Sequence, residues 1–262
     1  MSIIKRNNIN VSGEGQKPMI FAHGFGCDQN MWRFVAPEFE RDHKVILFDH
    51  VGAGRSDLGA YDQKKYATLE GYADDVVEIC EALNVENGIF VGHSVSAMIG
   101  ALASIKSPKQ FEKLVLVCPS PCYLNDGDYQ GGFSRQQLEE LLEFLDENHM
   151  GWSAQMAPLI MGNADRPELS EELENSFCRT DPDIARAFAR ATFLSDNRAD
   201  LASVRPACLV LQCKEDVIAG QQVGKYVKEH IPDAHLALID AYGHCPNLSA
   251  PDEVIKAMRD FV

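Results

Sequence analysis

Positive charge is scarce in this sequence. The 262 residues include 24 Lys and Arg against 39 Asp and Glu, which gives a formal net charge of −15 at pH 7. A chain of this charge repels phosphate backbones and anionic lipid, so we expect neither nucleic-acid binding nor binding to a membrane surface. The sequence also has no apolar run of transmembrane length and no signal-peptide core near its start. These absences predict a cytoplasmic protein.

Motifs for metals, nucleotides and disulfide frameworks are missing as well. Eight cysteines are scattered along the chain without a C-x-x-C pair, and several lie in apolar runs, so we expect buried free thiols in a reducing compartment. The Cys and His positions have no metal-ligand spacing, and neither a G-x-G-x-x-G fingerprint nor a P-loop is present. The sequence therefore predicts no metal and no cofactor.

Residues 88–100, GIFVGHSVSAMIG, have the pattern of a nucleophile elbow. A short apolar run reaches Gly92, turns at Ser94 and continues as a helix of small residues. The usual G-x-S-x-G motif is changed at one place, because Ser96 replaces the second glycine. Ser96 is still small enough to let the helix approach the strand. Ser94 is the predicted nucleophile, and the N–H of Val95 is a predicted donor to the developing oxyanion.

Strand-like and helix-like segments alternate through most of the chain. We expect an edge strand over 3–11, further strands ending near residues 22, 48, 93, 117, 212 and 240, and an amphipathic helix over 68–83. This alternation predicts an α/β protein with a mostly parallel central sheet and helices on both faces.

Only helix signals are found between residues 120 and 195. Ser134 with Gln137 resembles a capping box, Ser170 is a candidate helix start, and Pro182 suits a first helical turn. We therefore expect a core made of residues 1–119 and 196–262, with residues 120–195 inserted as a helical lid.

Three loops that follow strands carry the groups of a catalytic triad. Ser94, Asp216 and His244 occur in the order typical of the α/β-hydrolase fold, and ligands in open α/β sheets bind at the carboxyl ends of strands. His244 is the predicted base that accepts the serine proton, and Asp216 the carboxylate that orients it. Glu215 and Asp240 stay open as alternatives for the carboxylate, and His50 stays open as an alternative for the base.

The remaining candidates are weaker. We expect His43, His149, His230 and His235 at the surface, and His23 bonded to backbone. Ser56 follows a glycine but has no helix of small residues after it, so it is interpreted as a loop serine. The loop His23-Gly24-Phe25-Gly26 is predicted to supply the second oxyanion donor, the N–H of Phe25, because its glycines let the backbone approach a ligand.

Several motifs together resemble the RsbQ family of α/β-hydrolases, bacterial stress-signalling regulators related to the plant strigolactone and karrikin receptors. They are HGFGCDQNMW, FDHVGAGRSD, GHSVSAMIG, PSPCYLND, LQCKEDVIA and GHCPNLSAPDE. The resemblance covers essentially the whole chain. It implies a four-helix lid over a hydrophobic pocket, the same triad, and action with a PAS-domain phosphatase. The pocket positions that it implies are Phe25, Phe133, Trp152, Phe193 and Ile218. One departure is Gly220, where proline is expected.

Two functions follow from these observations. The residues themselves indicate a cytosolic serine carboxylesterase or lactonase acting on a small apolar substrate. The resemblance indicates a signalling protein that cleaves or senses a small hydrophobic ester or lactone, such as a butenolide, and acts in a stress response through a protein partner. A dehalogenase is disfavoured because its elbow nucleophile is aspartate, and a cofactor-free oxygenase or perhydrolase is a distant third.

Overall fold

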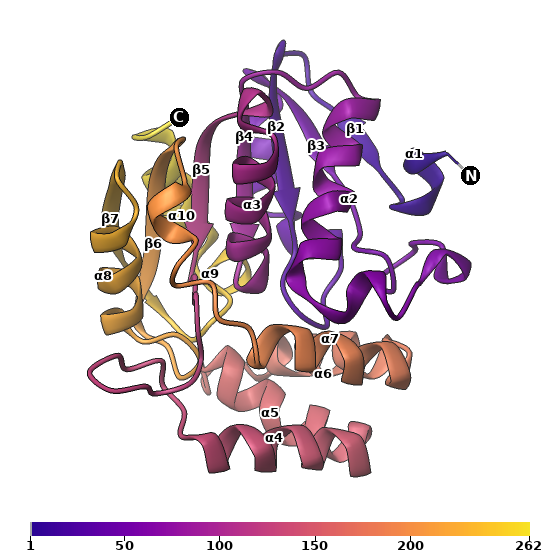
Figure 1. The fold of residues 1–262 in the computed structure, drawn as a ribbon, viewed down its shortest axis with the longest axis vertical. Helices are drawn as coiled ribbons and strands as arrows, with labels where there is room; N and C mark the ends of the chain where they lie inside the picture. The colour runs from indigo at the N-terminus through magenta and orange to yellow at the C-terminus, as the bar shows by residue number, and fades with distance from the viewer. Residues whose placement is uncertain (1) are drawn as a thin grey trace.

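A seven-stranded sheet forms the centre of the computed structural model, which describes residues 2–262 (Figure 1). The strands lie in the order β1-β3-β2-β4-β5-β6-β7; β1 pairs antiparallel with β3, and all other neighbours are parallel. Their bounds are β1 Asn10–Ser12, β2 Lys17–Ala22, β3 His43–Leu47, β4 Gly88–His93, β5 Phe111–Val117, β6 Ala207–Glu215 and β7 Ala234–Tyr242. The predicted mostly parallel sheet is confirmed.

Both faces of the sheet are covered because its strands are apolar on both sides. In β2, Met19 and Phe21 belong to one hydrophobic core, while Ile20 and Ala22 belong to the other. One face packs against α2 (Leu69–Ala82), α3 (Val95–Lys106) and α8 (Gln221–His230). The opposite face carries α9 (Pro246–Ser249), α10 (Pro251–Arg259) and the 3₁₀ turns η1 (Gln29–Trp32) and η2 (Ala36–Phe39). The other 3₁₀ turns are η3 Leu58–Ala60, η4 Lys65–Ala67, η5 Pro108–Gln110 and η6 Leu201–Ser203.

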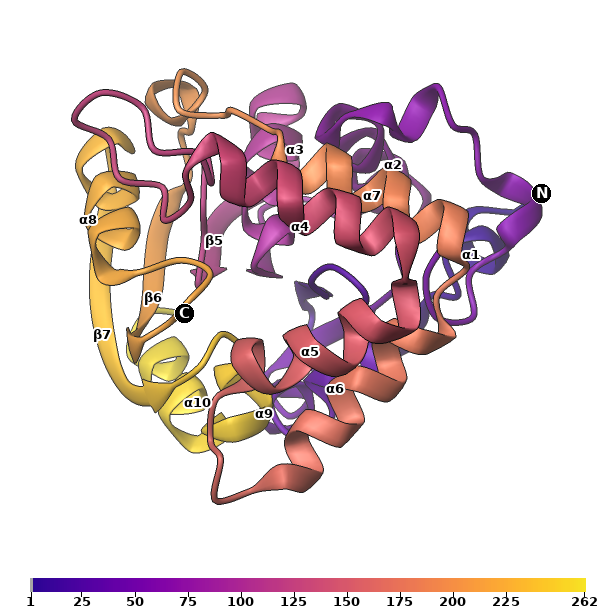
Figure 2. The ribbon, with the colours of Figure 1, turned by 90° about the horizontal axis from the view of Figure 1, so that it is seen from below.

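Four helices are inserted between β5 and β6. They are α4 Arg135–Glu147, α5 His149–Met161, α6 Pro167–Arg179 and α7 Pro182–Phe193. They lie across the end of the sheet, and Figure 2 shows α4 beside α7 and α5 beside α6, with the two pairs meeting at one end. This four-helix insertion therefore covers the edge of the sheet at which the predicted site residues are found.

The helix starts in the insertion follow the local signals with one exception. The capping box of Ser134 and Gln137 is confirmed, and Pro182 occupies the first turn of α7 behind the N-cap Asp181. The prediction that Ser170 begins a helix is wrong. Helix α6 begins at Pro167, whose fixed φ suits a first helical turn, and Ser170 lies inside the helix.

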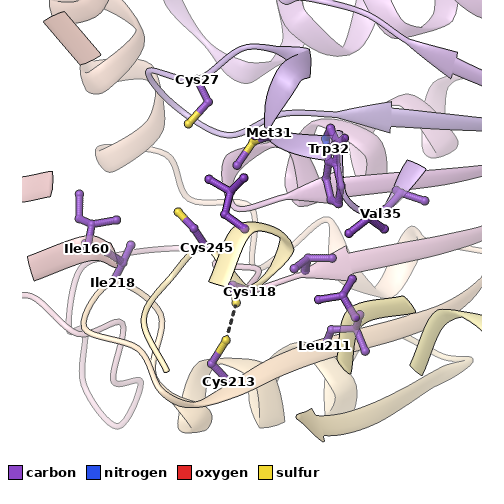
Figure 3. Packing of buried hydrophobic residues seen from close by; sticks show 14 of the residues in the cluster. Cys27, Met31, Trp32, Val35, Cys118, Ile160, Leu211, Cys213, Ile218 and Cys245 are labelled. Atoms are coloured by element: carbon purple, nitrogen blue, oxygen red, sulfur yellow. Dashed lines mark hydrogen bonds between the residues drawn. The ribbon is translucent and has the colours of Figure 1, made fainter. Parts of the chain in front are cut away.

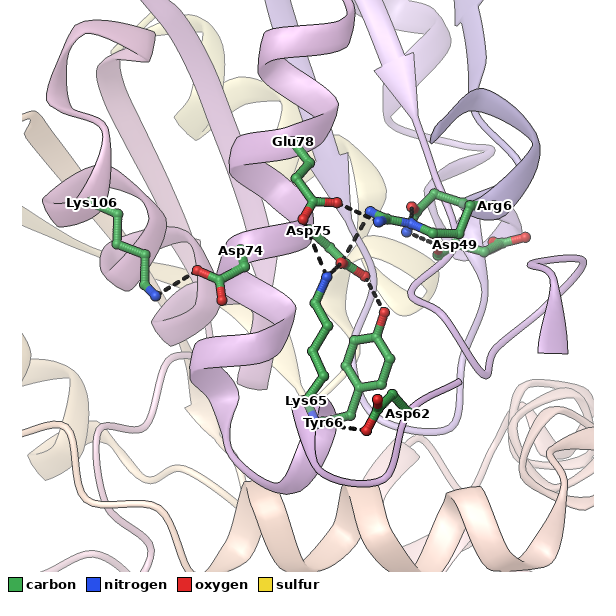
Figure 4. A network of polar contacts seen from close by, with 10 residues as sticks. Arg6, Asp49, Asp62, Lys65, Tyr66, Asp74, Asp75, Glu78 and Lys106 are labelled. Carbon is green, nitrogen blue, oxygen red and sulfur yellow. Dashed lines mark hydrogen bonds and ion pairs between the residues drawn. The ribbon is translucent and has the colours of Figure 1, made fainter. Parts of the chain in front are cut away.

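The N-terminal segment also differs from the prediction. Residues Ile3–Arg6 form a short helix, α1, and the strand that pairs with the sheet is Asn10–Ser12 instead of the expected 3–11. Arg6 fixes this helix to α2, because its guanidinium pairs with the buried Asp75 at 3.0 Å and also bonds Glu78 (Figure 4). Arg6 thus has a tertiary role that its local sequence does not reveal.

The cysteines are free, as predicted, and all except the half-buried Cys178 are buried. Across residues 2–262, none of the helices combines the length and the apolar character needed to span a bilayer.

Candidate active site

Ser94 lies at a sharp turn between β4 and α3. Its backbone has φ 57° and ψ −124°, a conformation that costs energy for a residue with a side chain. The turn is held by the Ser94 N–H, which donates to the carbonyl of Val117 in the neighbouring strand at 2.8 Å. A Cβ at Gly92 would lie 2.4 Å from the carbonyl oxygen of Ser96, so only glycine lets the helix pass so close to the strand. The local geometry is that of the predicted elbow.

Ser94, His244 and Asp216 are brought together in a continuous chain of hydrogen bonds. The Ser94 Oγ lies 2.7 Å from His244 Nε2, and His244 Nδ1 lies 2.7 Å from Asp216 Oδ2. A carboxylate can only accept, so Nδ1–H donates to Asp216, and Nε2 is then free to accept the proton of the Ser94 hydroxyl. The arrangement places the imidazole of His244 against the serine hydroxyl, in position to accept its proton.

Asp216 is held as an anion although its carboxylate is fully buried. Burial alone would raise its pKa, but His244 and the N–H groups of Ile218 and Ala219 outweigh that effect and lower the pKa. Those two N–H groups donate to Oδ1 at 2.8 and 3.1 Å, which leaves Oδ2 for the imidazole. The carboxylate is therefore fixed in position and in charge.

The alternative triad members lie elsewhere. Glu215 and Asp240 are exposed, and Asp240 pairs with Lys214 at 2.8 Å. His50 Nε2 lies 2.8 Å from the Oγ of Ser96, not from the nucleophile, and the Ser96 hydroxyl in turn donates to the His23 carbonyl. His50 and Ser96 therefore support the loops around the site and do not face the Ser94 hydroxyl.

Two of the four histidines predicted at the surface are less exposed than expected. His149 is buried at the start of α5 and His43 is half-buried against Phe39, whereas His230 and His235 are exposed. The first turn of an inserted helix faces the core here, which local polarity does not indicate. His23 bonds backbone as predicted, since its Nδ1 lies 2.9 Å from the Gly24 carbonyl and its Nε2 accepts the His50 N–H.

The loop that carries Phe25 runs directly beside the nucleophile. A Cβ at Gly24 would lie 2.6 Å from His93 Nδ1 and 3.3 Å from Ser94 Cβ. Val95 begins α3, and the first N–H groups of a helix have no partner within it. The N–H groups of Phe25 and Val95 thus come from two segments that flank Ser94.

A small apolar cavity of about 30 Å³ adjoins Ser94 and His244. Its other lining residues are Phe25, Cys27, His93, Tyr123, Ile160, Leu173, Phe177, Thr192, Phe193, Ile218 and Cys245. Three of the pocket positions that the resemblance implies, Phe25, Phe193 and Ile218, line this cavity. Phe133 and Trp152 do not: Trp152 packs behind Phe25 and Phe177, at ring distances of 5.9 and 5.3 Å.

Several lining residues were not singled out by sequence reasoning. Tyr123 lies within the quoted motif PSPCYLND, is fully buried, and packs its ring 5.1 Å from that of Phe193. Burial raises the pKa of Tyr123, so its hydroxyl stays neutral. Phe177 comes from α6, where its ring fills the space beside Gly26. A side chain contributed by an inserted helix gives no local signal of the cavity it will face.

Among residues 2–262, one group of side chains could share a metal ion, which the sequence spacing did not indicate. Ligand atoms of Cys118, Asp216 and His244 all lie within 4.8 Å of one another. This group overlaps the hydrogen-bonded chain described above.

Comparison with known proteins gives consistent matches over nearly the whole chain. A model described as "Alpha/beta hydrolase family" matches residues 19–257. The Strigolactone esterase RMS3 of Pisum sativum is 41% identical, with 95% of this chain and 94% of that protein aligned. The Karrikin insensitive 2 receptor CA of Petunia hybrida is 38% identical, with 98% of this chain and 96% of that protein aligned. The structure of a hydrolase from Oleispira antarctica superimposes with a TM-score of 0.97 at 46% identity, covering 99% of this chain and 95% of that one.

Proposed function

Because the chain belongs to the alpha/beta hydrolase family, we propose that it is a serine hydrolase acting on a small hydrophobic ester or lactone. The single observation that carries this proposal is the continuous contact from Asp216 through His244 to the Ser94 hydroxyl, with 2.7 Å at each step. A relative named as an esterase, aligned over 95% of the chain, supports the same reaction class.

The proposed reaction is acyl transfer through a covalent intermediate. His244 Nε2 takes the Ser94 proton as Oγ attacks the carbonyl carbon, and Asp216 stabilises the imidazolium that forms. The N–H groups of Val95 and Phe25 receive the oxyanion. His244 then protonates the leaving alkoxide, and a water activated by the same ring releases the acyl group. For a lactone the leaving alcohol stays attached to the acyl chain, which gives one ring-opened product.

The substrate is proposed to be small because the cavity is small. A volume of about 30 Å³ holds about two water molecules. Its walls are mostly aromatic and aliphatic, so an apolar acyl group fits them better than a charged one. We propose that residues 120–195 act as a lid over a core of 1–119 and 196–262, and that a larger ligand enters only when these helices move.

A role in ligand sensing is the second part of the proposal. It is supported by the receptor of Petunia hybrida, which aligns over 98% of this chain. In this function the protein is cytoplasmic, turns over slowly and signals through a protein partner that recognises the lid. The RsbQ resemblance favours a PAS-domain phosphatase as this partner and a stress response as the setting. The alternative is a general carboxylesterase or lactonase without a signalling role.

Hydrolysis of p-nitrophenyl acetate and labelling by a fluorophosphonate probe test the site. Ser94→Ala should abolish labelling and lower kcat by about three orders of magnitude or more. Ser56→Ala is the matched control, because Ser56 only accepts the Gly52 N–H in its loop at 3.0 Å. Unchanged labelling of Ser94→Ala would refute the assignment.

The two roles differ in how a bound ligand affects the surface. If the protein is a sensor, a butenolide ester should raise the melting temperature of Ser94→Ala and change the protease sensitivity of residues 120–195. A candidate phosphatase should then bind more tightly with ligand than without. Fast turnover of many esters, with no ligand-dependent binding, would favour the plain esterase.

A further inference from the structure

We propose that Cys118, Asp216 and His244 form an inhibitory site for a thiophilic divalent cation such as Zn²⁺. Their ligand atoms lie within 4.8 Å of one another, and the side chains of Asp216 and His244 are 0% and 5% exposed. Cys118 is fully buried at the end of β5. Thiolate sulfur, carboxylate oxygen and imidazole nitrogen are the three ligand types that Zn²⁺ uses in proteins.

The backbone of Cys118 supports a specific role for its thiol. Its φ is 50°, in the left-handed region that glycine adopts freely and a residue with a side chain adopts at a cost. The Cys118 N–H donates to the Leu211 carbonyl in β6 at 2.8 Å, which fixes the first residue after β5 against the neighbouring strand. The chain therefore keeps a sulfur behind the triad where a glycine would be less strained.

A second thiol extends the ligand set. The Sγ atoms of Cys118 and Cys213 lie 3.6 Å apart, and Figure 3 shows them pointing toward each other, Cys118 from just after β5 and Cys213 from β6. Two sulfurs bound tetrahedrally to one Zn²⁺ at about 2.3 Å each are about 3.8 Å apart, close to this separation. Cys213 is not within 4.8 Å of all three of the other ligand atoms, so it can reach the fourth position only if its side chain moves.

The charge of the site also suits a divalent cation. One thiolate from Cys118 and the carboxylate of Asp216 together neutralise a charge of +2, with His244 bound as a neutral ring. A buried ion needs this compensation, because an unpaired charge in an apolar interior is strongly unfavourable. The metal ligand is a thiolate, so Cys213 would join the ion only by losing its own proton and otherwise remains beside it.

Ion binding would switch off the serine. In the ion-free protein, Nδ1 of His244 carries the proton and faces Asp216, which leaves Nε2 as the acceptor. If Nδ1 binds the ion instead, the neutral ring carries its proton on Nε2 and can no longer accept one from Ser94. The inhibition rests on the proposed function of the triad, whereas binding of the ion does not.

Titration of the full-length protein with Zn²⁺ tests the proposal. Ester hydrolysis should fall as Zn²⁺ rises and recover fully on adding EDTA, while Mg²⁺, which prefers oxygen ligands, should have no effect. Cd²⁺ should bind one ion per chain with an ultraviolet thiolate-to-metal absorbance band. This band reports binding even if the protein proves to have no esterase activity.

Cys118→Gly is the decisive variant, since glycine suits the backbone there and removes the whole thiol side chain. It should raise the inhibiting Zn²⁺ concentration by about 100-fold or more and remove the Cd²⁺ band, with each rate compared to its own ion-free value. Cys118→Ser serves the same purpose if the glycine variant is unstable. Cys208→Ala is the matched control, because Cys208 is a buried strand cysteine remote from the triad carboxylate, and it should leave both readouts unchanged.

Two outcomes would overturn the proposal. One is that Cys118→Gly binds Cd²⁺ and responds to Zn²⁺ as the unmodified protein does. The other is that EDTA does not restore the activity lost on adding Zn²⁺, which would mean that the loss does not come from reversible ion binding.

Discussion

The side chain of His93 donates a hydrogen bond from Nε2 to the backbone carbonyl of His244 at 2.7 Å. The residue before the nucleophile thus holds the main chain of the base, 151 positions further along the sequence. The N–H of His244 is held as well, because it donates to the Ile160 carbonyl in α5 at 2.8 Å. The imidazole of His244 is therefore positioned from both the elbow and the four-helix insertion.

Replacing His93 should harm catalysis more than substrate binding. His93→Phe keeps a ring but leaves the His244 carbonyl without its donor, so we expect kcat to fall about tenfold, with KM nearly unchanged and a stability loss of about 1–3 kcal/mol. His93→Gln, whose amide nitrogen reaches a similar position, should restore most of kcat. Steady-state kinetics of both variants check this, and equal losses in kcat would contradict a positioning role.

The buried histidines predict how stability depends on pH. Burial lowers the pKa values of His23 and His50, and it lowers that of His93 to about 3. Below pH 6.5 the unfolded chain binds protons at these positions that the folded chain does not, so the free energy of unfolding must fall as pH falls. His93 alone should cost about 1 kcal/mol between pH 6.5 and 5.5, with His23 and His50 adding in the same direction.

Urea unfolding followed by circular dichroism at pH 7.5, 6.5 and 5.5 measures this dependence. The effect should be small between the first two values and large between the last two. His93→Gln should flatten the dependence, because it removes one group that titrates only in the unfolded chain. Equal stability of the unmodified protein at all three values would contradict the prediction.

The ion pairs of α2 allow a direct comparison of a buried and an exposed carboxylate. Asp75 is 0% exposed and contacts Lys65 at 2.6 Å and the Tyr66 hydroxyl at 2.9 Å, in addition to Arg6 (Figure 4). Asp75→Ala takes the buried carboxylate away from Arg6 and Lys65, which then keep only the 38% exposed Glu78 as an acidic partner. We expect it to lower the free energy of unfolding by about 3–5 kcal/mol.

The neighbouring Asp74 is the matched control for this experiment. It pairs with Lys106 at 2.6 Å, but its side chain is 48% exposed. Asp74→Ala should therefore cost no more than about 1 kcal/mol. Chemical denaturation of both variants checks the contrast, which would be refuted if the two losses were similar.

The sequence predicted the parts of the site that depend on strand order. Ser94, Asp216 and His244 each follow a parallel strand, so the topology alone brings their loops to one edge of the sheet. The capping box at Ser134 was also predicted, because it depends only on residues three positions apart. The residues that line the cavity were not all predicted, because they depend on packing between distant segments. Trp152 lies one layer behind the cavity, while Phe177 from α6 lines it.

Non-local contacts also explain the other differences. The helix Ile3–Arg6 replaces an expected strand where Arg6 reaches the carboxylates of α2. The approach of Cys118 to the triad carboxylate depends on the turn after β5, which no residue spacing reveals. Local pattern thus specifies the elements and their ends, whereas the lining of the cavity is decided by how the inserted helices cross.

The size of the cavity predicts a preference among substrates. Because about 30 Å³ adjoins the Ser94 hydroxyl, p-nitrophenyl acetate should be hydrolysed faster than the butanoate, and the octanoate slowest. Phe177 forms part of the wall and packs 6.0 Å from the Phe25 ring. Phe177→Ala should open the cavity and shift the preference in kcat/KM toward the longer chains by about tenfold, the effect of about 1.4 kcal/mol in binding the transition state.

Phe133→Ala is the control, since Phe133 lies in the segment before α4 and does not line the cavity. It should leave the chain-length order unchanged. Removing a buried ring can cost about 3–5 kcal/mol of stability, so melting curves must accompany the kinetics, and Phe177→Leu offers a milder change with the same direction. A chain-length order that is the same in the unmodified protein and in both Phe177 variants would mean that the helices open before the ester binds, and that the closed cavity does not select the acyl group.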